Sequence, residues 1–430
     1  MISRQSKHSK WTWRINREFL QYLSIYPNSI SLKLQLLKEA FVATLVILGA
    51  VYLVSFIPLK FELAKPIKQE FGDFDVYDLV FSGKHKENLP RDTNIIFVQV
   101  GDSRDQIAHQ LYILRNLEPK LIALDVTFDQ PNPNDPDADS LLVGEIRKTP
   151  NLVLASKLVL DSTGDDLIPQ SSFFVHDSLR SKEGFINFLG EEVSVIRMFS
   201  PSTKIEAREV ECFACRIAEK VYPDKWRKLK EREKRIEVID YTKNQNSFLS
   251  FSYDDLKDYS PAQLKDIFRD KIVLIGFFTR KGALVMEDIH FTPMNEKISG
   301  KSYPDSYGLL IHANILSMIH HGEYPYLLSR FWTYCIAGIL CFLLLLFVFG
   351  YYVKNPHPAH LRFVLIQFTA ILLLSWFFLV LFERYRFKVP LLPIILALIM
   401  SVELLGIYKI VARLMNKWFG YKTIFKQSHF

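Results

Sequence analysis

Four apolar segments, each long enough to cross a membrane, constrain this chain more than any other feature. A spanning helix needs about 20 predominantly apolar residues, and the ranges that meet this length are 40–59, 331–353, 363–382 and 389–410. The first precedes a long polar stretch, and the other three follow it in close succession. Because the first is too long and too far from the N-terminus for a cleaved signal peptide, we expect a signal anchor.

Charge divides the chain at the same places. The whole chain has a formal net charge of +7, yet residues 60–328 hold more acidic than basic side chains, whereas 1–39 and 411–430 are basic. Positive charge beside apolar spans reflects membrane topology, so no nucleic-acid partner is expected. Both termini are therefore predicted to be cytoplasmic in a bacterial inner membrane, with 60–328 on the periplasmic side. Three basic residues in 383–388, on the predicted outer side, oppose this rule.

The long polar region alternates between strand and helix patterns. Continuous apolar runs at 94–100, 120–128 and 271–279 are typical of strands buried on both faces. A helical pattern separates the first two, which indicates a parallel strand–helix–strand unit. Another helix is predicted over 306–321, ended by Gly322. The predicted fold is an α/β extracytoplasmic domain with a mainly parallel sheet, plus four transmembrane α-helices.

Four polar residues stand out in this domain: Asp102, Asp125, Asp288 and His312. Ligands of open α/β sheets bind at the carboxyl ends of the strands, where Asp102 and Asp125 are predicted to lie. His312 is predicted to be buried on an apolar helix face, paired first with Asp125 and otherwise with Asp288. The group can be a structural lock, a ligand or metal site, or a hydrolytic centre. The lock is favoured.

No catalytic residue, cofactor or metal site is predicted, because three familiar motifs are missing. The chain has no phosphate-binding glycine loop, no His-Glu-x-x-His helix and no Gly-x-Ser-x-Gly turn. Residues 135–140 are rich in Asp, but the glycine and glutamate that an EF-hand loop needs are replaced by Ser140 and Ile146. Cys212 and Cys215 either pack as small apolar groups or have a redox or disulfide role, and both interpretations stay open.

Glu403 is the one carboxylate inside the fourth apolar segment. A charged group at membrane depth is costly and usually faces a partner. We therefore expect Glu403 to contact a partner helix in the membrane, with snorkelling to the cytoplasmic surface as the alternative.

Several short motifs occur in the order seen in a known family. They are "FVQVGDS", "LIALDVTFD", "DADSLL", "GFINF", "KIVLIGF", "EDIHFTP" and "YGLLIHANIL", followed by three apolar spans. In this order the chain resembles the second type of CHASE domain, an extracellular sensory module of bacterial cyclases, histidine kinases and related receptors. The resemblance implies an envelope-facing sensor, and it places Asp102, Asp125, Asp288 and His312 on recurrent polar positions of the family.

The chain departs from that family at its C-terminal end. Such receptors usually continue into a cytoplasmic output domain, whereas residues 411–430 are too few to fold as one. We therefore expect a non-enzymatic, sensor-like protein in the lipid bilayer that signals through a separate membrane protein partner. A homo-oligomer is compatible with this expectation. The alternative is a non-sensory scaffold or accessory subunit of an inner-membrane complex.

Overall fold

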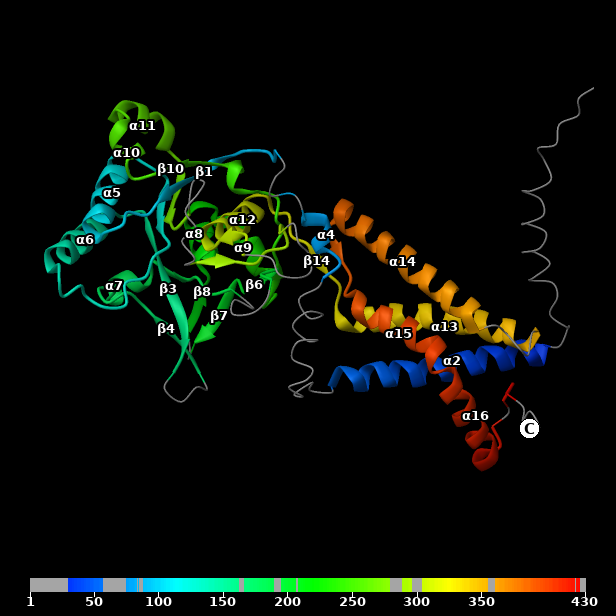
Figure 1. The fold of residues 1–430 in the computed structure, drawn as a ribbon. Coiled ribbons are helices and arrows are strands. Elements are labelled where there is room, and N and C mark those ends of the chain that lie inside the picture. Colours follow the sequence, from blue (N-terminus) through cyan, green and yellow to red (C-terminus); the bar gives the residue numbers. More distant parts are fainter. Residues whose placement is uncertain are drawn as a thin grey trace, which may run out of the picture. The chain divides into compact units, whose positions relative to one another are not determined.

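The structure is a computed structural model that forms two compact units. It describes residues 30–56, 75–82, 84, 88–161, 166–188, 195–205, 208–278, 288–295, 304–354, 360–421 and 423–425. One unit, here the helical unit, comprises Met1–Pro58, Leu328–Phe377 and Val389–Phe430. The other, the globular unit, comprises Leu59–Leu327 together with Phe378–Lys388. Figure 1 shows the elements of both, and each unit is described separately below.

A seven-stranded sheet forms the centre of the globular unit. Its order is β10-β1-β11-β2-β3-β4, with β5 also paired to β3. All pairs are parallel except β3 with β4, which confirms the predicted mainly parallel sheet. The strands are β1 (Asp92–Gln99), β2 (Leu121–Leu124), β3 (Leu152–Leu160), β4 (Leu167–Gln170), β5 (Glu183–Phe185), β10 (Phe248–Phe251) and β11 (Ile272–Gly276). Every residue of β2 and β11 is buried, as the continuous apolar runs indicated.

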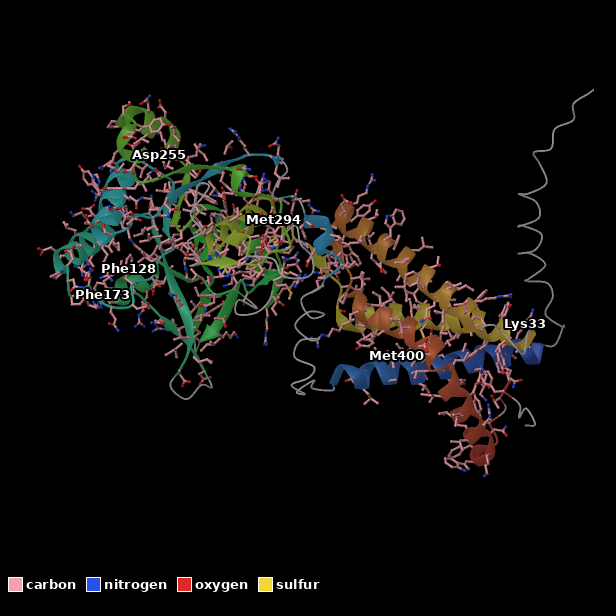
Figure 2. All side chains as sticks on the ribbon, viewed as in Figure 1. Lys33, Phe128, Phe173, Asp255, Met294 and Met400 are labelled. Atoms are coloured by element: carbon pink, nitrogen blue, oxygen red, sulfur yellow. The ribbon has the colours of Figure 1, made fainter. Side chains whose placement is uncertain are left out.

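One face of the sheet carries a core shared with a layer of helices. Its helices are α5 (Arg104–Asn116), α6 (Pro136–Lys148), α7 (Asp177–Arg180), α10 (Asp255–Asp258) and α11 (Pro261–Phe268). Ile107, Leu111 and Leu142 are among the side chains of this layer that pack against the strands. At the same face Phe128 and Phe173 lie close together (Figure 2), and the Phe173 N–H donates to the Phe128 carbonyl at 2.9 Å.

The other layer contains α8 (Phe213–Val221) and α12 (Gly308–His321), which contact β2, β3 and β11 between them. The helix α9 (Pro223–Lys230) follows α8 and also contacts α12. The sheet is therefore covered on both faces, which is the arrangement expected for parallel strands. The remaining short elements are α4 (Asp78–Phe81), β6 (Met198–Phe199), β7 (Ser202–Ile205), β8 (Arg208–Glu211), β9 (Glu237–Val238), β12 (Ile289–His290), β13 (Ser306–Tyr307), β14 (Tyr326–Leu327) and β15 (Phe387–Lys388).

Among the described residues, three helices are long and apolar enough to cross a membrane; two lie in the helical unit, and the third begins there and ends in the globular unit. They are α2 (Ile30–Phe56), α13 (Arg330–Lys354) and α14 (His360–Tyr385). The first starts well before the predicted boundary at residue 40, so residues 30–39, assigned to the basic cytoplasmic segment, are helical. Figure 2 marks Lys33 near the beginning of this helix.

The fourth predicted span, 389–410, is not one continuous helix. It breaks at Leu404 into α15 (Leu391–Glu403) and α16 (Leu405–Phe419), which are bent by 66°. The hydroxyl of Ser401 donates to the Leu398 carbonyl at 2.6 Å, a side-chain bond that competes with the helix ladder. Gly406, just beyond the break, further weakens helix continuity. The described part of the chain therefore has three candidate spans, or four if the bent pair crosses as one.

Candidate functional site

The helix α12 contributes His312 to a group of polar residues that also includes Asp288 and His290. Every residue from 308 to 319 is buried. Gly308 is the first residue of the helix and lies directly against the side chain of Asp288. A Cβ atom at position 308 would be only 2.9 Å from both carboxylate oxygens of Asp288. Gly322 ends the helix at φ +73, in the left-handed region that favours glycine. The absence of a side chain at Gly308 thus lets a carboxylate sit at a helix N-terminus, where negative charge is stabilised.

His312 is buried within an aromatic environment. It is 3% exposed, and its ring centroid lies 4.6 Å from that of Phe188 and 5.2 Å from that of Phe213. Its Nδ1 atom makes no hydrogen bond with any part of the chain that the structure describes. Burial, helped by the nearby His290, lowers the pKa of His312 to about 3. The predicted burial is confirmed, and the imidazole is neutral near pH ~7.

A second histidine, His290, joins Asp288 to this environment. The Nε2 atom of His290 lies 3.0 Å from Asp288 Oδ1, and its ring packs edge-on against Phe188 with centroids 5.5 Å apart. Asp288 has φ +64, a conformation that Asp tolerates better than most residues. Sequence reasoning missed His290, for which the only signal was its place two residues after Asp288 in "DIH".

Asp125 also lies beside α12, but its described neighbours are different. It follows β2, it is 9% exposed, and its Cβ lies 3.2 Å from the Cβ that Gly276 would carry. The Cδ1 atom of Leu309 in α12 lies 3.0 Å from the same Cβ position at Gly276. The described contacts of His312 include the rings of Phe188 and Phe213 and the nearby His290, and the expected pairing of His312 with Asp125 stays a prediction. The strand-end position of Asp125 agrees with the sequence.

Asp102 does not join this group, because its side chain is exposed. The turn after β1 is held instead by two glutamines: Gln110 Oε1 accepts from Gly101 N at 2.9 Å, and Gln106 Oε1 accepts from Asp102 N at 3.0 Å. The structure thus brings Asp288, His290 and His312 to one end of α12 and leaves Asp102 in solvent.

A small cavity lies beside the start of the same helix. It has a volume of about 150 Å³ and is lined by Phe97, Met294, Asp305 and Leu310, with three amide side chains at 244–246. Figure 2 labels Met294 in this part of the globular unit. Sites for small organic ligands usually measure about 300–1,000 Å³, so this cavity suits an ion or a few waters better than an organic ligand.

The two cysteines of α8 and its N-cap are free thiols. Cys212 and Cys215 are both buried and unpaired as a disulfide. A hydrogen bond with Cys212, together with burial, raises the pKa of the Cys215 thiol well above its usual value. A thiol with a raised pKa is a poor nucleophile, so the packing interpretation describes this pair.

Glu403 is the last residue of α15, directly before the break at Leu404, and it is exposed. Within the described part of the chain it forms no ion pair. Its neighbours Ser401 and Val402 are buried against other helices of the unit. The carboxylate therefore points away from this chain's own helix packing, as a partner contact requires.

The segment Phe378–Lys388, here called the docked loop, belongs to the globular unit and comprises the C-terminal end of α14, Arg386 and β15. Its strand β15 pairs in parallel with β14, matching Tyr326 with Phe387. Arg386 Nε lies 2.8 Å from Oδ2 of Asp240, and Lys388 Nζ lies 2.5 Å from Oδ2 of Asp75. Two of the three basic residues that opposed the charge rule are thus paired with carboxylates of the globular unit.

Aromatic packing extends this attachment. The Phe382 ring centroid lies 4.9 Å from that of Tyr77 and 5.7 Å from that of Phe81. Phe382 and Tyr77 are both almost fully buried. Sequence analysis gave no signal for this contact, because partners so far apart in the chain share no spacing pattern.

A family model for the CHASE2 domain matches residues 64–350, more than half of the chain. The chain belongs to the CHASE2 family. The matched range includes the whole α/β sheet and most of α13, so the family assignment covers a sensory domain and the span that follows it. Neither the curated proteins nor the solved structures gave a match. The protein is therefore a multi-pass membrane protein with a CHASE2 sensory domain, as the ordered motifs implied.

Proposed function

We propose that this protein is a transmembrane sensor that reads a cue outside the cytoplasm and transmits it to a separate membrane protein. The observation that carries the proposal is the docked loop Phe378–Lys388, which is part of the CHASE2 domain's own unit. The same loop is covalently continuous with α14 and α15. A change in the sensory domain therefore acts directly on the ends of two membrane-type helices.

The docked loop also links α12 to these helices by a short path. The strand β14 follows soon after α12 in the chain and is paired with β15, which leads into α15. The ring of Tyr326 in β14 stacks on that of Phe387 in β15, with centroids 5.3 Å apart. A shift of α12 against the sheet would therefore pull on the start of α15.

The orientation that we propose keeps both termini in the cytoplasm of a bacterial cell and residues 60–328 on the periplasmic side. Support comes from the basic termini. The positive-inside rule counts Lys and Arg rather than net charge, so the three basic residues of 383–388 remain an exception to it, and the basic residues of the two termini outnumber them.

Glu403 is the proposed contact with the partner. It is an exposed carboxylate at a helix break in an apolar segment, and a charge in that environment needs a donor or cation. The partner is expected to offer a basic or hydroxyl side chain from a membrane helix and to carry the output domain.

The test is purification from the native membrane in mild detergent, followed by mass spectrometry of the recovered proteins. Glu403→Leu should lower the recovery of the partner by about tenfold, equivalent to about 1.4 kcal/mol, and Glu403→Gln by less because it still offers an acceptor. Glu383→Gln, which changes an exposed carboxylate near the end of α14, is the matched control. Unchanged recovery with both variants at 403 would remove Glu403 from the interface.

The same preparation separates the sensor from a scaffold. A sensor should copurify with a protein that bears a kinase, cyclase or similar output domain. Stoichiometric recovery of a large envelope assembly without an output domain would instead favour the scaffold or accessory subunit.

A further inference from the structure

We propose that a second, larger cavity in the globular unit binds a small zwitterion that carries an ammonium group and a carboxylate. The cavity has a volume of about 540 Å³, within the usual range for small-molecule sites. It is formed by β3, β4, β5 and the β7–β8 hairpin, and its lining residues include Ser156, Ile168, Glu183 and Arg208.

Glu183 is the acceptor of this site. The residue is 6% exposed, and its Oε2 accepts a hydrogen bond from the Ser171 hydroxyl at 2.8 Å. Its Oε1 is buried and has no hydrogen-bond partner within the described residues. A buried carboxylate oxygen without a donor is costly, and an ammonium group in the cavity would supply that donor. Burial also raises the pKa of Glu183 above its usual value, in keeping with an incompletely compensated carboxylate.

Arginines at the same cavity supply the opposite charge. Arg208 lines it and is exposed, and a guanidinium group binds a carboxylate through two parallel hydrogen bonds. Arg180 also lines the cavity, and its charge acts on Glu183. Arg216 lines the cavity too, but it is engaged: its Nε donates to the Glu183 carbonyl at 2.9 Å and its Nη2 to Glu211 at 2.7 Å. A wall that offers both an acceptor and guanidinium donors fits a molecule with both charges.

Apolar side chains complete the lining and limit the size of the molecule. Ile168, Pro169, Ile205 and Val210 face the same space. They suit a short aliphatic or amide side chain between the two charged ends. The fitting class is therefore an amino acid or a dipeptide.

The cavity borders the helix layer that leads to the docked loop. The bond from Arg216 to the Glu183 carbonyl joins α8 to β5. Gly184 lies so close to α8 that a Cβ there would be 2.7 Å from Phe213 Cα. Phe213 in turn packs on His312 of α12. The signalling use of this site rests on the sensor function proposed above, whereas binding to the cavity does not.

The experiment is isothermal titration of the full-length protein in detergent. The probes are each common L-amino acid, tested singly, and the dipeptide alanyl-alanine. Propionate and ethylamine serve as single-charge controls, and glycine betaine as a zwitterion without an N–H donor. At least one amino acid or the dipeptide should bind, and the three controls should not. Absence of binding by every amino acid and by the dipeptide would overturn the proposal.

Variants locate the binding in this cavity. Glu183→Gln keeps the shape but removes the carboxylate, and it should weaken binding by about tenfold to 100-fold, as expected for loss of a charge-assisted hydrogen bond. Arg208→Gln, on the exposed rim, should weaken it similarly and stays informative if the variant at 183 fails to fold. Glu231→Gln, an exposed position away from the cavity, is the control. Equal affinity in all three variants would place the ligand elsewhere.

If the ligand binds but the output of the partner protein does not change, the sensor function is contradicted while the binding site is supported. If no ligand binds to the cavity, the evidence from the docked loop and from the partner contact at Glu403 is unaffected. The two failures are therefore distinguishable.

Discussion

At the scale of single residues, His312 makes the stability of the sensory domain depend on acidity. The pKa of His312 falls from 6.5 to about 3 because the ring is buried beside Phe188, Phe213 and His290. The folded-state pKa is thus depressed, so between these two values the unfolded chain binds more protons than the folded one. Stability is complete above the unfolded pKa and is lost as the pH falls through this window.

We predict that the domain of the detergent-purified protein loses roughly 2 kcal/mol of stability from His312 between pH ~7 and pH ~5. His312→Leu should remove most of this pH dependence, because no proton is then taken up on unfolding. The measurement is the thermal unfolding midpoint at a series of pH values. His176→Leu, which changes an exposed histidine, is the control and should keep the wild-type slope. An unchanged slope in His312→Leu would show that other groups carry the acid sensitivity.

The burial of His312 could be predicted from the sequence, but its neighbours could not. The apolar positions three and four residues away placed it on a buried helix face, and this was correct. The neighbours Phe188 and His290 were not predicted, since they come from segments whose distance from α12 no local spacing reveals, and the pairing with Asp125 stays a prediction. The Glu183 cavity was missed for the same reason, because its walls come from β3, β4, β5 and a hairpin.

At the scale of elements, the docked loop depends on a buried ion pair. Asp240 is 2% exposed, whereas the side chain of Arg386 is 28% exposed. Burial raises the pKa of Asp240 despite the attraction of Arg386 and Lys84. Removal of the Arg386 side chain leaves the buried carboxylate of Asp240 without a cation. Removal of the Asp240 carboxylate leaves an arginine that can still be hydrated.

We therefore predict an asymmetric pair of effects. Arg386→Met should destabilise the globular unit by roughly 3 kcal/mol, and Asp240→Asn by clearly less. The double variant should recover much of the loss, which a double-mutant cycle of denaturant midpoints would measure. Equal and additive losses for the two single variants would contradict the ion pair.

The break between α15 and α16 shows what hydropathy cannot predict. The apolar content of 389–410 predicted a membrane segment, and the structure keeps it as a candidate span only if the bent pair crosses as one. Near the 66° bend, the Ser401 hydroxyl and the Gln367 amide both donate to the Leu398 carbonyl, at 2.6 and 2.8 Å. The Gln367 bond joins residues far apart in the chain, and a count of apolar residues does not reveal it.

At the scale of the whole molecule, the fold class followed from the sequence because buried parallel strands are continuously apolar. The runs at 94–100, 120–128 and 271–279 correspond to β1, β2 and β11, three adjacent strands of the sheet. Their spatial order was not predictable, because β11 inserts between β1 and β2 from far along the chain. The assignment of the docked loop to the globular unit depends on similarly distant contacts.

The central claim is that the CHASE2 domain and the C-terminal tail lie on opposite sides of one membrane. The most direct test uses a reporter that is active only outside the cytoplasm. It is inserted after Asp161, between β3 and β4 in the chain, or fused after Phe430. The account predicts an active reporter at the first position and a silent one at the second. Activity at the tail, or silence in the domain with the protein correctly folded and inserted, would contradict it.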